Sequence, residues 1–158
     1  GLRCWPLLAA LVPAGLAPNA KGQFSGLQLS HGAGHVVRAV LEGLAFELKR
    51  HIGFLRNAGV PIERLVLSGS AASSRVTPQI LADVTELPLA GAGNRGGSPL
   101  GAAIIARGLC EPATSLAELA VEMAPGASRV EPGAAAPLYR EPFNEYLRSL
   151  PLMEGDSR

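Results

Sequence analysis

A run of small residues from Ser68 to Ala71, here called the small-residue loop, has the composition best suited to holding a ligand. It follows residues 64–67, which their apolar character predicts to be a short buried strand, and a helix is expected to begin soon afterwards at Thr77. Glycine and small side chains leave backbone N–H groups free and keep bulk out of a ligand's path. Near a helix N-terminus, such a loop can hold a nucleotide against the main chain. An ordinary strand-to-helix turn is the alternative interpretation.

Residues 91–96 form a second glycine-rich stretch, with the GxGxxG spacing of dinucleotide-binding loops. The strand expected before it, at 87–89, is very short, and the next helix is expected only from about Pro99. No convincing strand ending in an acidic residue follows, although a dinucleotide site would use one. A dinucleotide-binding domain is therefore kept as a minor alternative.

Single residue types suggest three further chemistries. His31 and His35 lie one helical turn apart, and Glu42 lies nearly two turns beyond, a spacing that could ligate zinc. Because Gly32 and Gly34 disfavour a rigid helical pair, capping or otherwise satisfied histidines are the expectation. Glu42 could be a catalytic carboxylate, but a hydrogen bond to nearby backbone at a helix–loop junction is expected instead. The serines around the small-residue loop form no GxSxG motif, which argues against a serine hydrolase.

Composition narrows the classes of protein to consider. The chain has 158 residues, enough for one domain with its own core, and its net charge of +1 gives no electrostatic footprint for nucleic acid. Hydrophobic residues make up 47% and charged residues 17%, so the chain either buries unusually much or belongs to a larger body that covers it. Two isolated cysteines, Cys4 and Cys110, favour a reducing compartment such as the cytoplasm. No apolar run approaches the ~18 residues of a membrane span.

The stretch 5–20 imitates a secretory signal, since an apolar run follows the basic Arg3. However, no initiator Met is present, and prolines interrupt the run at Pro6, Pro13 and Pro18. Because each proline removes a backbone donor and fixes its own φ, a loop is expected here instead.

Helix and strand patterns alternate, which predicts an α/β fold. The clearest element is a helix over 35–57, whose apolar residues recur at three- and four-residue steps to form one stripe: Val37, Val40, Leu41, Leu44, Leu48, Ile52 and Leu55. Its later turns carry Lys49, Arg50 and Arg56, where the helix dipole favours cations, and Gly59 and Pro61 end it.

The remaining elements are shorter. Strands are expected at 23–29, 64–67 and 87–89, and helices at 77–86, 99–107, 115–123 and 142–150. Thr77 suits an N-cap position with Pro78 at the first helical position. The last helix should present one apolar face made of Phe143, Tyr146, Leu147 and Leu150, while residues 124–137 lack periodicity and are predicted to be a linker.

The most specific pattern lies in residues 22–43, here called the signature segment. It is a glycine-spaced apolar stretch that runs into a His-started helix, with the order Gly22, Phe24, Gly26, Leu27, His35, Arg38-Ala39 and Glu42-Gly43. This order and spacing resembles the C-terminal signature of the FGGY carbohydrate kinases. Those enzymes use ATP to phosphorylate sugars and polyols such as xylulose, ribulose and glycerol. The lead-in resembles the family more loosely, because Ala9 to Leu16 stands where the family has a polar stretch.

Two other stretches resemble the same family. Around the small-residue loop, the matching positions in order are Gly69, Ala72, Ser74, Gln79, Ala82 and Asp83, whereas Ser70 replaces a second glycine. The stretch 100–106 resembles the family's Leu-Gly-Ala-Ala helix, which helps wall the adenine pocket, although Gly96-Gly97-Ser98 stands where the family often has a glutamate. The resemblance thus implies these nucleotide-binding residues: Ser68, Gly69, Ser70, Ala71, Ser74, Gln79 and Gly101.

The resemblance also implies a fold of the actin-like ATPase, ribonuclease H-like α/β type, incomplete at its N-terminal strands. Residues 1–123 would be part of a C-terminal nucleotide-binding domain, and 124–158 a linker and terminal helix. ATP would be the cofactor, with Mg²⁺ held through its phosphates, and the acceptor a small sugar or polyol, with xylulose or another pentulose first. The catalytic aspartate is expected in an N-terminal domain outside this chain, so no catalytic residue or metal ligand is assigned.

The expected partners follow from the same resemblance. They are the missing N-terminal kinase domain and a possible second copy of the chain, with no nucleic acid and no membrane. The chain alone is expected to be inactive. A hypothesis from a different class makes it a non-catalytic, truncated or accessory module that binds nucleotide weakly or only mediates association.

Overall fold

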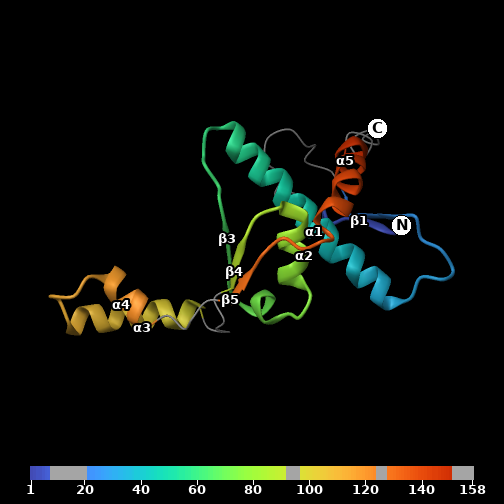
Figure 1. The fold of residues 1–158 in the computed structure, drawn as a ribbon. Helices are drawn as coiled ribbons and strands as arrows, with labels where there is room; N and C mark the ends of the chain where they lie inside the picture. The colour runs from blue at the N-terminus through green and yellow to red at the C-terminus, as the bar shows by residue number, and fades with distance from the viewer. Residues whose placement is uncertain (8–20, 92–96, 124–127, 151–158) are drawn as a thin grey trace.

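The computed structural model describes residues 1–7, 21–91, 97–123 and 128–150 (Figure 1). Helices and strands alternate in the order β1 (Arg3–Trp5), β2 (Gln23–Ser25), α1 (Ala33–Asn57), β3 (Leu65–Leu67), η1 (Ser70–Ser73), α2 (Thr77–Thr85), β4 (Leu89–Gly91), α3 (Gly97–Cys110), α4 (Leu116–Met123), β5 (Ser128–Val130), η2 (Ala136–Tyr139) and α5 (Arg140–Ser149). β1 and β2 pair antiparallel. In the other sheet, β4 lies between β3, to which it is parallel, and β5, to which it is antiparallel. The helical crossover through α2 is what a parallel β3–β4 pair requires.

Helix α1 begins and ends close to the residues that the sequence predicts. The N–H of Gly32 donates to Nδ1 of His35 over 3.1 Å, which satisfies one of the free donors at the helix start. At the other end, Gly59 has φ of +85°, a left-handed conformation that glycine adopts without a steric penalty. Arg56 in the last turn donates to the carbonyl of Ile62 and ties down the chain that leads into β3.

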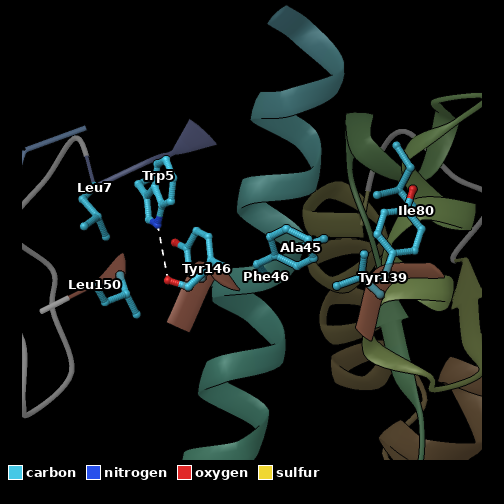
Figure 2. Close-up of a cluster of buried hydrophobic side chains, with 9 residues drawn as sticks. Trp5, Leu7, Ala45, Phe46, Ile80, Tyr139, Tyr146 and Leu150 are labelled. Atoms are coloured by element: carbon cyan, nitrogen blue, oxygen red, sulfur yellow. Dashed lines mark hydrogen bonds between the residues drawn. The ribbon is translucent and has the colours of Figure 1, made fainter. Parts of the chain in front are cut away.

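The hydrophobic core lies on one side of α1, between β1, α2 and the C-terminal segment (Figure 2). Its buried residues are Trp5, Leu7, Ala45, Phe46, Ile80, Val84, Tyr139, Tyr146 and Leu150. The rings of Trp5 and Tyr146 stack with centroids 5.7 Å apart, and the Trp5 indole N–H donates to the Tyr146 carbonyl. Phe46 packs against both tyrosine rings, so aromatic contacts join the first residues of the chain to its last helix.

Residues 128–150 belong to this packing, which corrects the prediction of a linker at 124–137 for its described part. β5 extends the sheet, and Tyr139 and Tyr146 fill the core. Buried Asp83 accepts hydrogen bonds from the backbone N–H of Gly133 at 2.6 Å and from the Gln79 amide at 2.8 Å. Residues 124–127 and 151–158 of the predicted C-terminal part lie outside the described residues, and the division at residue 123 stays a prediction.

Several other elements differ from expectation. The predicted stripe of α1 coincides only in part with its buried face. Ile52 is buried and Leu41 packs against the core, whereas Val37, Leu44 and Leu55 are exposed. The other buried residues of α1 are Ala39, Gly43, Ala45 and Phe46. β3 is an edge strand whose Val66 is exposed, so the prediction of a buried strand is wrong. The strand predicted at 87–89 starts two residues later, at Leu89, and the strand predicted at 23–29 covers only 23–25.

Helices α3 and α4 extend away from the core (Figure 1). α3 and α4 pack on each other, with Gly108 at their closest approach, where a Cβ would come within 2.6 Å of the Leu116 side chain. No residue of α3 is buried, and α4 buries only Leu119. The unit Gly97–Met123, here called the α3–α4 hairpin, therefore gains little cover from the rest of the described chain.

Candidate functional site: the loop after strand β3

The small-residue loop leaves the end of β3 in a conformation that requires glycine. Gly69 has φ of +75° and ψ of −159°, a region that L-residues with a Cβ rarely adopt. A Cβ built at Gly69 would meet no atom within 4 Å, so this side of the backbone faces open space. The chain then turns into η1, whose residues Ser70–Ser73 bury no side chain. The loop thus presents main chain, with little bulk around it, at the end of a strand.

The first turn of α3 lies beside this loop. A Cβ at Gly97 would be 3.7 Å from the Cβ of Ser68, so the helix starts against the residue that follows β3. The first N–H groups of a helix have no partner within it and carry its positive dipole end. The first turn of α3 contains no acidic residue that would neutralise this end. Gly101 lies one turn further along, and a Cβ there would also meet open space.

The side chain of Ser74 is hydrogen-bonded to the residues at the start of α2. Its Oγ accepts hydrogen bonds from the N–H of Val76 at 3.4 Å, the N–H of Thr77 at 3.2 Å and the Thr77 hydroxyl at 2.8 Å. Ser74 therefore stabilises the start of α2. The prediction that Thr77 is the N-cap is wrong, because Thr77 is the first helical residue and follows Val76.

Gln79 is likewise engaged by protein groups. Its side-chain nitrogen donates to Asp83 Oδ1 and, at 3.1 Å, to the carbonyl of Glu131. The bond to Glu131 holds the segment after β5 against α2, whereas the bond to Asp83 stays within α2 and orients the carboxylate that accepts from the Gly133 N–H. The structure thus brings Ser68 against the start of α3, and Gly69, Ser70 and Ala71 follow it in the loop. Ser74 and Gln79 instead support α2.

The polar side chains and glycines of the signature segment make contacts within the protein. Glu42 Oε1 accepts hydrogen bonds from Arg38 Nε at 2.6 Å and from the Tyr139 hydroxyl at 3.1 Å, and Arg38 also contacts that hydroxyl. The expected backbone partner of Glu42 is therefore wrong, since its partners are side chains. Burial and the adjacent Glu42 carboxylate raise the pKa of Tyr139. Sequence patterns did not indicate Tyr139, because it lies 97 residues from Glu42.

Glycines of the signature segment allow close backbone approach. A Cβ at Gly43 would lie 2.3 Å from the carbonyl oxygen of Cys4, so only glycine lets β1 pack on α1 at this point. Gly26 has φ of +80°, and a Cβ at this position would lie 2.7 Å from the carbonyl oxygen of Gly1. These contacts explain physically why a glycine-spaced pattern surrounds the start of α1.

The two histidines are hydrogen-bonded within this segment, as expected. Nδ1 of His31 accepts from the N–H of Gln28 at 2.9 Å, and Nδ1 of His35 accepts from Gly32. Among the residues that the structure describes, no three His, Cys, Asp or Glu side chains gather as metal ligands would. The GxGxxG alternative falls mostly on 92–96, outside the described residues.

Two hollows lie elsewhere on the molecule. A recess of about 120 Å³ beside the signature segment is lined by Arg3, Glu42 and Phe46 among others, and is smaller than the ~300 Å³ at which ligand pockets begin. A shallow groove of about 430 Å³ runs between the ends of α1, α2 and α5. The small-residue loop lines neither of these two hollows. None of the described helices combines the length and hydropathy needed to cross a bilayer.

Comparison with known proteins identifies the class. Residues 1–107 match the C-terminal domain of the FGGY family of carbohydrate kinases. The xylulose kinase of Escherichia coli K12 is 34% identical over 141 residues, which are 86% of this chain and 29% of that protein. The glycerol kinase of Myxococcus xanthus is 35% identical over 63% of this chain and 20% of its own length.

Solved structures give the same result. The chain resembles the xylulose kinase of Rhodospirillum rubrum with a TM-score of 0.69 and 29% identity, over 86% of this chain and 29% of that one. The glycerol kinase of Plasmodium falciparum shares the fold at a TM-score of 0.78 and 19% identity, over 96% of this chain and 30% of that one. The fold is thus that of the sugar kinases, the predicted actin-like α/β class. The chain belongs to the FGGY family of carbohydrate kinases and spans under a third of the length of these relatives.

Proposed function

We propose that this chain is the nucleotide-binding part of an ATP-dependent sugar kinase whose acceptor is a pentulose such as xylulose. The observation that carries the proposal is the open backbone at Gly69, placed between the end of β3 and the start of α3. Membership of the family supports ATP as the phosphoryl donor, and the xylulose kinase relatives support the choice of sugar. The proposal includes a cytoplasmic location, where ATP is available.

The proposed contacts divide into two groups. Ser68, Gly69, Ser70 and Ala71 would lie against the adenosine with their backbone, and Gly101 would leave room for it along α3. Ser74 and Gln79 would act indirectly, because their hydrogen bonds hold the start of α2 and the segment after β5. The open space at Gly69 is what a nucleotide would need, since a side chain there would push it away from the N–H groups.

The phosphoryl transfer step would use groups that this chain does not supply. Mg²⁺ would neutralise charge on the transferring phosphate, and it would be held through the nucleotide's phosphates. The base and the sugar-binding groups would come from an N-terminal kinase domain. The role of the present residues is to hold and orient the nucleotide.

The test of the nucleotide site is Gly69→Val in the full-length kinase. Valine is strained at φ of +75° and its side chain would occupy the open space, so we expect ATP affinity to fall at least about tenfold. Gly59→Val is the matched control, because Gly59 has φ of +85° and equally open surroundings but lies at the end of α1. It should carry a similar conformational cost and leave ATP affinity unchanged.

A second variant sharpens this test. Ser70→Gly should keep or improve ATP affinity, because it removes a side chain next to the proposed contact and restores the residue that kinases of this family usually carry. Isothermal titration with ATP measures all three variants. Equal affinities for the Gly69→Val variant and the unaltered protein would move the nucleotide site elsewhere.

Turnover separates this proposal from that of a non-catalytic module. The 158 residues alone should form no sugar-dependent ADP with xylulose, ribulose or glycerol, because positioning of the hydroxyl and its base are required. Kinase-like turnover by the pure chain would contradict the proposal that the base lies elsewhere. A full-length protein that neither binds ATP nor turns over would favour the association module instead.

A further inference from the structure

Asp83 on α2 is a buried carboxyl group that the proposed nucleotide contacts do not use. It is 5% exposed, and one of its oxygen atoms, Oδ1, accepts hydrogen bonds from the N–H of Gly133 at 2.6 Å and from the Gln79 amide at 2.8 Å. The same Gln79 amide donates to the carbonyl of Glu131. Residues 131–133, which directly follow β5, are therefore tied to α2 by hydrogen bonds that depend on Asp83 Oδ1.

The fit between this segment and α2 is close. A Cβ at Gly133 would lie 3.2 Å from Gln79 Nε2 and 3.4 Å from Asp83 Oδ1, so the backbone at Gly133 lies directly on the two side chains. A buried donor that loses its acceptor pays the cost of desolvation without a hydrogen bond in return. Removal of Oδ1 would therefore favour separation of residues 131–133 from α2, where water could reach the freed N–H.

The strand that leads into this segment borders the proposed nucleotide site. Ser128, the first residue of β5, pairs with Gly91 at the end of β4, and Gly91 pairs with Leu67, the residue before the small-residue loop (Figure 1). A Cβ at Gly91 would lie 2.5 Å from Ser128 Oγ, so the backbone of β4 lies against that side chain. β5 thus supports the edge of the sheet at which β3 opens into the small-residue loop.

We infer that Asp83 is a positioning residue for nucleotide binding, which acts through residues 131–133 and β5 without touching the nucleotide. By holding β5 against the end of β4, it fixes the edge of the sheet from which Gly69 extends. The action is indirect, because the loop follows β3, the bonds of Asp83 lead to β5, and β4 lies between these two strands. This inference rests on the proposed function, since the site that Asp83 positions is the proposed nucleotide site.

Glu86 provides a matched comparison at the end of the same helix. Its carboxylate accepts hydrogen bonds from Lys49 of α1 at 3.2 Å and from Arg140 of α5 at 3.1 Å. These bonds tie α2 to two other helices rather than to β5. If the loss of any carboxylate that holds α2 weakened ATP binding, Glu86→Leu would have the same effect as Asp83→Leu.

The experiment compares Asp83→Leu with Asp83→Asn in the full-length kinase. Leucine has the same branched shape but no acceptor, whereas asparagine keeps an Oδ1 that can accept both hydrogen bonds. We expect Asp83→Leu to raise the KM for ATP at least about fivefold, with kcat and the KM for xylulose changed less than about twofold. Asp83→Asn should restore the KM for ATP to within about twofold of the unaltered enzyme, and Glu86→Leu should leave it unchanged. A purely structural role would instead lower the amount of active enzyme and leave both KM values as they are.

A second variant and a second readout support the comparison. Gln79→Met removes the bonds of the amide but not Oδ1, and it should raise the KM for ATP even where Asp83→Leu fails to fold. Hydrogen exchange of the unaltered kinase needs no variant. Because coupling between two sites is reciprocal, ATP should slow exchange at the Gly133 amide, although that amide does not lie at the nucleotide.

Other results overturn the inference. An unchanged KM for ATP in Asp83→Leu, an equal rise in Glu86→Leu, or exchange at Gly133 that ATP does not alter would each exclude the positioning role. A failure of Asp83→Asn to restore the KM would show that Oδ1 is not the group that matters. Gly69→Val tests the nucleotide site separately. Weaker ATP binding in Gly69→Val together with an unchanged KM in Asp83→Leu would remove the role of Asp83 alone, whereas unchanged binding in Gly69→Val would remove the site itself.

Discussion

Two regions of this short chain differ in how fully their side chains are buried. The first is the core around Phe46 on α1, and the second is formed by β3, η1 and the α3–α4 hairpin. In the first, Tyr146 is 0% exposed and is held by a stacked indole and a carboxylate. In the second, η1 and α3 bury no side chain. The first region is stabilised by its own side chains. The second leaves its side chains largely uncovered by the rest of the described chain. We place the nucleotide in this second region.

Truncating a core aromatic should separate the two regions most strongly. Tyr146→Ala removes a fully buried ring stacked on Trp5 and should lower the free energy of unfolding by about 3–5 kcal/mol, as other buried aromatic truncations do. Leu109→Ala, at an exposed position of the α3–α4 hairpin, should change it by less than about 0.5 kcal/mol. Urea denaturation followed by circular dichroism measures both. Similar values for the two variants would mean that the regions do not differ in how fully they are buried.

Replacing a glycine by alanine in each region should change the free energy of unfolding in opposite directions, by smaller amounts. Gly43→Ala would place a Cβ 2.3 Å from the Cys4 carbonyl, and the forced shift should cost about 1–3 kcal/mol. Gly101→Ala meets open space inside α3 and should stabilise by up to about 1 kcal/mol through helix propensity. Thermal unfolding of the two variants gives opposite signs if this is correct. Destabilisation by Gly101→Ala would show that α3 is already covered by something.

The sequence predicted the elements whose signals are local. The end of α1 depends on Gly59, which acts through a left-handed backbone conformation that a glycine reveals by itself. The apolar face of α5 was predicted in part, because Tyr146 and Leu150 recur at helical spacing and are buried, whereas Leu147 of the predicted face is exposed. The family could be suspected from the signature segment, since its glycines are required by close contacts within a short stretch.

What could not be predicted depends on distant partners. The exposed residues Val37, Leu44 and Leu55 of α1 recur with the same periodicity as a buried face. Only the arrangement of the other elements shows that Phe46 and Ala39 face the core instead. β5 has three residues and is formed by pairing with β4, which no local pattern encodes. In the candidate site, the glycine at 69 was recognisable, but the occupied amide of Gln79 was not, because its partner Glu131 lies 52 residues away.

The smallest expected effect concerns a charge in the core around Phe46. Burial alone would raise the pKa of Glu47, but hydrogen bonds from Arg50 and Tyr146, both 2.7 Å long, outweigh it and lower the pKa below its ordinary value of 4.5. A lowered pKa in the folded state means that the carboxylate contributes stability above about pH 4.5, and that this contribution is lost as pH falls through the folded pKa.

Glu47→Gln keeps an acceptor for the Tyr146 hydroxyl but removes the charge. It should cost about 1 kcal/mol at pH 7, the difference between a charged and a neutral acceptor, and the cost should shrink on acidification below pH 4.5. Urea unfolding at pH 7, 5 and 3.5 measures this difference between the variant and the unaltered chain. A difference that is the same at all three pH values would show that Glu47 acts through packing alone. The core around Phe46 would then be stabilised by its aromatic side chains, with no contribution from the charge of Glu47.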